Sequence, residues 1–196
     1  MSDPLNTSDG RAPRVASHLA LDFLNTVVQT EDGPRDFLTD AAAVESWLKD
    51  SGWSDVVGAG APSGQLLRYA TELRAIARAL IRARIAGTAG DPTELNQVLA
   101  RGEGYPELHW PGGQGAPTLK LVRKRSGAAA ALAPLAESVA QLLTEPDFGV
   151  VRNCENPACS LLFLDRSKTR RRRWCDMSIC GNRMKVAAFR LRQQAK

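Results

Sequence analysis

Apolar residues recur at helical spacing along most of the first three quarters of the chain. The longest run covers residues 65–86, where leucine, isoleucine and alanine return every three or four positions until Gly87. A second run is predicted to begin after Thr39 or Asp40, either of which can cap a helix, and to continue to Asp50. Its expected buried residues are Val44, Trp47 and Leu48. Both runs predict amphipathic helices that pack on a core.

Two further segments also favour helices. Residues 18–29 predict a short amphipathic helix, followed by a turn at Gly33-Pro34. The apolar positions that support this helix are Leu21, Leu24 and Val28. The pair Asp91-Pro92 fits an N-cap followed by a proline in the first helical position, so another helix is predicted from there to about Arg101.

Two short extended runs interrupt the helical pattern. Residues 107–110 and 118–122 flank Pro111-Gly-Gly, which predicts a β-hairpin. Residues 126–143 are rich in alanine and leucine and predict a last helix that can bend at Pro134. The predicted fold class is therefore α+β, mainly α, with a helical N-terminal domain that includes a small β element.

Charge and cysteine content both change near residues 144–148. Residues 1–150 hold 14 Lys and Arg against 18 Asp and Glu, whereas residues 151–196 hold 12 against 3. All four cysteines lie in the basic part. This coincidence predicts two modules, an acidic helical domain at 14–146 and a basic module at 147–196, after a disordered leader at 1–13.

Neither a secretory signal nor a membrane span is visible. The polar first 13 residues lack an apolar core, and no apolar stretch approaches the roughly 18 residues that a membrane helix needs. We therefore expect a cytoplasmic protein that does not enter membranes and keeps its thiols reduced.

The cysteines form two pairs of equal spacing. Cys154 and Cys159 are separated by four residues, as are Cys175 and Cys180, and fifteen residues lie between the pairs. Such pairs predict one tetrahedral Zn²⁺ ion bound by four thiolates. The first pair encloses Asn156-Pro157 between two short strands, and the second leads into a helix. This arrangement predicts a treble-clef or zinc-ribbon-like finger.

Other interpretations of the cysteine pattern remain open. Two disulfides are disfavoured in a reducing compartment, and an iron centre is a less favoured alternative to zinc. Four thiolates leave no open position for a reactive water, so the zinc is expected to be structural. A segment this small is expected to depend on the metal, so chelation should unfold residues 150–196 and leave the helical body intact.

Basic residues crowd the same module. They predict a phosphate-binding surface for DNA, with RNA as an alternative. Three other interpretations are a solvated charged face, a contact with the acidic body, and binding to an anionic membrane surface. The candidate nucleic-acid residues are Arg166, Lys168, Arg170, Arg171, Arg172, Arg173, Arg183, Lys185, Arg190 and Arg192.

A polar cluster in the helical part is a candidate ligand pocket. Its members come from residues 18–29 and from the long helix, and they can also serve as caps, ion pairs or plain surface. They are Asp22, Asn25, Thr26, Arg74 and Arg78. No nucleophile–base pair, phosphate loop or paired carboxylate stands out, so we do not expect an enzyme.

At the basic module the sequence resembles the CGNR zinc finger family. The resemblance is carried by residues 162–165 (LFLD), 172–177 (RRWCDM) and the signature Cys-Gly-Asn-Arg at 180–183, together with both cysteine pairs. In this family an ABATE domain precedes the finger, and residues 19–26 (LALDFLNT) are similar to it.

The resemblance implies a transcription regulator, of a stress-responsive kind, with a ligand-sensing N-terminal domain. It implies that the four cysteines bind the metal and that Arg172, Arg173, Arg183 and Lys185 are the best nucleic-acid candidates. We also expect Gly181 to permit close backbone approach, and Asn182 to bond a thiolate or cap a turn. A homodimer that reads two half-sites fits this interpretation. The alternative function is a zinc-stabilised adaptor whose arginines dock an acidic protein.

Overall fold

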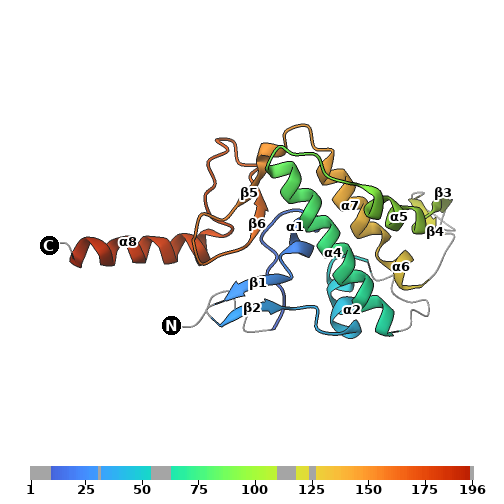
Figure 1. Ribbon diagram of the computed structural model, residues 1–196, viewed down its shortest axis with the longest axis horizontal. Coiled ribbons are helices and arrows are strands. Elements are labelled where there is room, and N and C mark those ends of the chain that lie inside the picture. The colour runs from blue at the N-terminus through green and yellow to red at the C-terminus, as the bar shows by residue number, and fades with distance from the viewer. Residues whose placement is uncertain (1–9, 31, 54–62, 110–117, 124–126, 195–196) are drawn as a thin grey trace, which may run out of the picture.

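Helices form most of the chain in the computed structural model, which describes residues 10–30, 32–53, 63–109, 118–123 and 127–194. The long helix α4 runs beside α2 and α7, as Figure 1 shows. The helices are α1 (Leu19–Leu24), α2 (Ala41–Asp50), α4 (Ser63–Ile85), α5 (Thr93–Arg101), α6 (Ala128–Ala131), α7 (Ala133–Leu143) and α8 (Asn182–Gln194). The predicted mainly helical α+β class is confirmed.

In the part of the chain that the structure describes, strands occur as three separate antiparallel hairpins. They are β1 (Val27–Thr30) with β2 (Gly33–Asp36), β3 (Gly104–His109) with β4 (Thr118–Arg123), and β5 (Val151–Asn153) with β6 (Leu162–Leu164). The predicted hairpin around residues 107–122 is confirmed, although its proposed turn at Pro111 lies outside the described residues.

The predicted helix over residues 18–29 is only half correct. It ends at Leu24, Asn25 caps it, and the chain turns into β1. The β-branched residues of this strand favour extended structure, and Val28 is fully buried there. The turn predicted at Gly33-Pro34 lies just before these residues. Gly33 begins β2 and pairs with Thr30, so it is part of the strand.

Helix α4 forms the centre of the hydrophobic core. Leu66, Leu73, Ala77 and Ile81 lie along one stripe and are almost fully buried against α1, α2 and α7. Burying a leucine or isoleucine side chain contributes about 1.5–3 kcal/mol relative to exposure. The predicted helix over residues 65–86 is therefore confirmed, and its apolar stripe organises the helical body.

The last helix of the body is broken into α6 and α7 at Leu132. Pro134 lies in the first turn of α7, where its missing N–H costs no helical hydrogen bond. The expected bend at Pro134 is thus a full break just before it. Helix α7 is buried on most of its surface, which explains why its sequence is so apolar.

The chain is already packed before α1. The predicted leader covers residues 1–13, of which 1–9 lie outside the described residues, but Pro13 is buried and Ala12 packs against the core. Arg14 donates to the carbonyl of Trp47 at 3.0 Å and lies over its indole ring. Within the described ranges, no helix combines the length and apolar character needed to cross a membrane.

The cysteine module is joined to the helical body by buried contacts. Asn25 donates through Nδ2 to the carbonyl of Leu162 at 2.8 Å and accepts from the Leu162 N–H at 3.0 Å. Leu164 donates its N–H to Ala16, and its side chain lies in the same core as the helices. The two modules therefore share one core at this junction.

Candidate zinc centre and basic surface

The four cysteines are supplied by two turns. Cys154 follows β5 and Cys159 precedes β6, so the first pair closes the β5–β6 hairpin. Cys175 ends the arginine-rich loop, and Cys180 lies in the π-helical turn η2 (Met177–Gly181) that leads into α8. The predicted strands and the predicted helix after the second pair are both present.

The first turn is held by its own backbone. Cys154 donates its N–H to Leu161 at 3.0 Å, and Cys159 donates to the carbonyl of Asn156 at 2.9 Å. Asn156 also accepts from the N–H of Ala158 at 3.1 Å. These bonds point the two thiols of the hairpin to the same side.

The four sulfur atoms form one compact cluster. All lie within 4.8 Å of one another, with Cys159 and Cys175 at 3.8 Å and Cys175 and Cys180 at 3.6 Å. A zinc ion with Zn–S bonds of about 2.3 Å requires S–S edges of about 3.8 Å. The donor set therefore fits one structural zinc ion, with every coordination position filled by protein.

Hydrogen bonds from neighbouring groups support the thiolates. Asn156 donates through Nδ2 to the sulfur of Cys180 at 3.3 Å, and the N–H of Cys175 points to the sulfur of Cys154 at 3.4 Å. Such bonds orient metal ligands and spread their negative charge. Asn156, which the sequence offered only as part of a tight turn, is thus a supporting residue of the zinc site.

The close packing of the thiols also explains their need for a cation. Hydrogen bonds from Cys159, Cys175 and Cys180 lower the pKa of Cys154 far below its usual range. The hydrogen bonds that Cys159 and Cys175 form with Cys154 in turn raise the pKa of both thiols. Zn²⁺ removes this conflict because it favours the thiolate at every ligand.

The turn η2 depends on Asp176 and Gly181. Asp176 caps it, accepting the N–H of Ser178 at 2.7 Å and that of Ile179 at 3.1 Å. A Cβ atom on Gly181 would lie 2.3 Å from the sulfur of Met177, so only glycine fits without a shift. Asn182 donates to the carbonyl of Ser178 at 3.3 Å. It thus fastens the turn, the second of its two predicted roles.

Asp165 organises the arginine-rich loop. Its buried carboxylate accepts the N–H of Ser167 at 3.1 Å, the Ser167 hydroxyl at 2.6 Å and the N–H of Arg172 at 2.9 Å. Burial alone would raise the pKa of Asp165, but the bonds from Ser167 and Arg172 outweigh it and lower the pKa. This carboxylate was noted in the sequence only as part of a family motif.

The arginines of the loop differ in what they contact. Arg172 is half-buried, stacks 4.4 Å from the Phe163 ring, and donates to carbonyls of Val15, Trp174 and Cys175. These contacts within the protein occupy the guanidinium group, so they do not favour a contact between Arg172 and nucleic acid. Arg173 pairs with Glu155 at 2.6 Å, and Arg170 pairs with Asp147.

The remaining candidate cations lie at the surface. Within the described residues, the Arg166, Lys168 and Arg171 side chains form no ion pair, and all three are exposed. On α8, Lys185, Arg190 and Arg192 are exposed and Arg183 is partly exposed. The structure thus places the candidate cations on two neighbouring surfaces of one module, the loop and the helix.

The five residues predicted to line a ligand pocket have partners within the protein. Asn25 bonds to Leu162, as described above, and Asp22 accepts from the N–H of Ala16 at 3.0 Å. Burial raises the pKa of Asp22, although that bond opposes the shift. Arg74 is buried, donates to Thr26 at 2.8 Å and forms an ion pair with Asp36.

Arg78, the fifth residue, donates to the carbonyl of Leu24 at 2.9 Å. It also lines a hollow of about 240 Å³ between α4 and the β5–β6 hairpin. These contacts give each of the five polar groups a structural reason to be present. A ligand pocket at these positions stays a prediction.

Fold and site together define a helical protein that carries a four-cysteine zinc finger at its C-terminal end. Residues 17–146 match the ABATE family, described as "putative stress-induced transcription regulator". Residues 151–193 match the CGNR zinc finger. The chain belongs to the ABATE family, and the expected order of the two parts is confirmed. No curated protein matches the chain.

Proposed function

We propose that this protein is a transcription regulator that binds duplex DNA through its zinc finger and senses a small ligand with its helical body. The observation that carries the first part is the exposure of α8. None of its residues is buried, and it projects away from the other helices (Figure 1). A helix held at one end by a metal-braced turn and uncovered elsewhere is available for a groove of DNA.

The side chains of α8 support this proposal. At 100° per residue, Asn182, Val186, Phe189 and Gln193 share one face of the helix. Arg183 and Arg190 flank that face on one side, and Lys185 and Arg192 flank it on the other. Amides can bond base edges, apolar side chains can contact thymine methyl groups, and the flanking cations suit phosphates.

The loop supplies the second basic surface. Arg166, Lys168 and Arg171 are exposed without ion pairs to other described residues, so phosphates can reach them. Zinc contributes by fixing the loop and η2 in one arrangement before binding, which lowers the entropic cost of ordering them. One finger contacts few base pairs, so the proposal includes a symmetric dimer on two half-sites.

The acidic-partner alternative also has an observation in its favour. Arg170 and Arg173 each bind a carboxylate of the protein itself, Asp147 and Glu155. The surface therefore accepts carboxylates as well as phosphates. The two hypotheses predict different binding to DNA, because only a transcription regulator should discriminate among duplex sequences.

The test is fluorescence anisotropy of the zinc-loaded chain with duplex DNA over a series of salt concentrations. Two triple variants are compared, Arg166→Ala/Lys168→Ala/Arg171→Ala in the loop and Lys185→Ala/Arg190→Ala/Arg192→Ala on α8. Each lost phosphate contact should reduce the slope of log K against log salt by about 0.9. We expect each variant to lower the slope by about 2–3. Arg172 is left intact because its loss would damage the finger.

The control variant Arg11→Ala/Lys49→Ala/Arg68→Ala removes three exposed cations that lie outside the finger. It should bind DNA like the unmodified chain, and all variants should retain one zinc per chain. Equal binding by the α8 variant would overturn the proposed interface. Preference for RNA over every duplex, or binding only to an acidic protein, would overturn the DNA regulator in favour of the corresponding alternative.

A further inference from the structure

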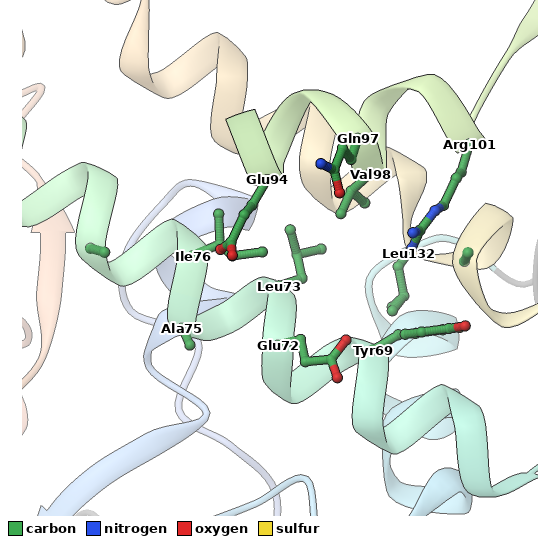
Figure 2. Close-up of a pocket in the computed structure, with 12 residues that line it drawn as sticks. Tyr69, Glu72, Leu73, Ala75, Ile76, Glu94, Gln97, Val98, Arg101 and Leu132 are labelled. Carbon is green, nitrogen blue, oxygen red and sulfur yellow. The ribbon is translucent and has the colours of Figure 1, made fainter. Parts of the chain in front are cut away.

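A cavity of about 450 Å³ opens between α4 and α5 and is closed at one end by α6. Figure 2 shows the side chains of α4 and α5 facing each other across it. None of the residues predicted from the sequence as a ligand pocket lines it. Cavities of this size are typical of small-molecule sites in proteins.

The centre of the cavity is apolar. Leu73 and Leu132 are fully buried beneath it, and Ile76 and Val98 are half-buried on its two walls. Small alanines of α4 and α6 line it and leave the space open. An apolar segment of a ligand placed here would leave water and contact these side chains.

Polar groups surround the apolar centre. Glu72 is already paired with Arg68 at 3.1 Å, and Arg101 lies 5.8 Å from the centre of the Tyr69 ring. Within the described part of the chain, neither the carboxylate of Glu94 nor the guanidinium of Arg101 forms a hydrogen bond or ion pair. These two opposite charges are therefore the ones available to a ligand.

The two charges lie at opposite ends of the cavity. Glu94 is in the first turn of α5 and Arg101 in its last turn, seven residues apart on the same helix face. At 1.5 Å per residue their backbones are about 10 Å apart along the axis. Figure 2 shows Leu73 and Val98 between Glu94, which lies beside Ile76, and the end occupied by Arg101 and Tyr69.

We propose that this cavity binds an elongated small molecule with an ammonium-type cation at one end, an apolar middle about two helical turns long, and a carboxylate at the other end. Glu94 binds the cation, Arg101 binds the carboxylate, and Leu73, Ile76 and Val98 contact the middle. This inference names the ligand class for the sensing role proposed above and rests on that role only for its biological consequence.

The charge pattern selects this class over simpler ones. A fatty acid would satisfy Arg101 but place its tail toward the carboxylate of Glu94. An alkylamine would satisfy Glu94 but leave Arg101 without an anion. Glu94 and Arg101 are both exposed, so water solvates them in the free protein. A molecule with both charges forms a charge pair at each end and also fills the apolar centre between them.

The test is calorimetric titration of the full, zinc-loaded chain with 8-aminooctanoate, whose charges are about 10 Å apart when extended, a length that matches two turns of α5. Octanoate and octylamine are titrated as probes that lack one charge each. We expect 8-aminooctanoate to bind about tenfold more tightly than either, because it alone forms a charge pair at both ends of the cavity; tenfold corresponds to about 1.4 kcal/mol. No heat from any probe at millimolar concentration would overturn the proposal.

Variants assign the two ends. Glu94→Gln should abolish the preference over octanoate, and Arg101→Gln should abolish the preference over octylamine. Glu107→Gln removes an exposed carboxylate on β3, outside the cavity, and should change nothing. Ala75→Phe fills the cavity from an exposed helix position and should abolish binding of all three probes.

A urea titration of each variant verifies that it is folded, because Glu94 and Arg101 also suit the dipole of α5. Equal affinities for the three probes in the unmodified chain would overturn the two-charge assignment, as would unchanged preferences in both end variants. Since the titration contains no nucleic acid, its outcome is independent of whether the finger binds DNA.

Discussion

Single polar side chains set the conformation of the finger loops because each satisfies several backbone groups at once. Asp165 fixes both ends of the arginine-rich loop, and Arg172 binds three carbonyls, one at Val15 and two at the adjacent residues Trp174 and Cys175. Losing such a side chain leaves several buried polar groups without partners, which costs more than one hydrogen bond. The exposed arginines beside them depend on these two residues for their positions.

His18 holds the start of α1 through its neutral ring. Its Nδ1 atom accepts the N–H of Ala20 at 3.2 Å, which a protonated imidazole cannot do. Burial, and then the nearby charge of Arg166, lowers the pKa of His18, while Glu145 opposes the shift. A lowered pKa means that the folded chain binds fewer protons at His18 than the unfolded chain does.

The free energy of unfolding should therefore include a His18 contribution that is complete above the unfolded pKa of about 6.5 and is lost as pH falls through the lower folded pKa. Replacing His18 with serine keeps a good helix cap that does not titrate. We expect His18→Ser to remove part of the pH dependence between neutral pH and pH 5, by up to about 1 kcal/mol. Urea unfolding at several pH values measures it.

The comparison with His18→Ser cancels other acid-sensitive terms, including protonation of the zinc ligands, because these are the same in both chains. Parallel curves of unfolding free energy against pH would show that folding does not change the pKa of His18. Curves that diverge above pH 7 would contradict the sign of the shift.

At the scale of elements, periodicity predicted helices correctly where one stripe meets one core. Helix α2 buries the expected Val44, Trp47 and Leu48, and Asp40 caps it. The apolar run of α4 is buried or partly buried except at its end, where Ile85 is exposed. The segment 18–29 was assigned wrongly because three apolar residues at helical spacing also fit a helix followed by a strand. What ends α1 is a contact between Asn25 and Leu162, far apart in the chain, which local pattern does not contain.

The β1–β2 hairpin is fastened to α4 by Arg74. Its guanidinium bonds the hydroxyl of Thr26 and the carboxylate of Asp36, while its own side chain is only 6% exposed. Arg74→Ala should lower the free energy of unfolding by about 2 kcal/mol, since charged hydrogen bonds contribute about 1.5–3 kcal/mol and Asp36 can be rehydrated. Urea unfolding with tryptophan fluorescence measures the loss.

The matched control is Arg68→Ala on the same helix, whose pair with Glu72 is exposed on both sides. It should cost less than about 1 kcal/mol. A double-mutant cycle of Arg74→Ala with Asp36→Asn should show coupling between the two sites. Additive effects of the two substitutions would mean that the pair does not hold the hairpin.

At the scale of the whole molecule, the sequence predicted the metal ligands but not the residues that hold those ligands in place. Spacing alone identified Cys154, Cys159, Cys175 and Cys180, because a tetrahedral site needs two pairs from two turns. Asn156 was not identified as a ligand partner, since its bond to Cys180 appears only once both turns are folded together. The α4–α5 cavity was likewise invisible, because it depends on how small residues of α4 and α6 meet α5.

The sequence also predicted that metal removal would unfold only the finger. The structure leads to a different expectation, because buried Val28 and half-buried Phe37 pack around the zinc cysteines. In the other direction, Val151 and Leu164 of the finger lie in the core of the helical body. Loss of zinc should therefore loosen residues on both sides of the junction.

Hydrogen exchange measured by mass spectrometry, with and without a zinc chelator, tests this expectation. Exchange should rise across residues 151–194 and also in β1 and β2, while the buried centres of α4 and α7 stay protected. Cys154→Ser/Cys175→Ser should reproduce the pattern without chelator, which separates metal loss from chelator effects. A rise confined to residues 151–194 would mean that the finger folds as a separate unit. The β1–β2 hairpin distinguishes the two cases because it belongs to the N-terminal part of the chain and packs on the zinc site.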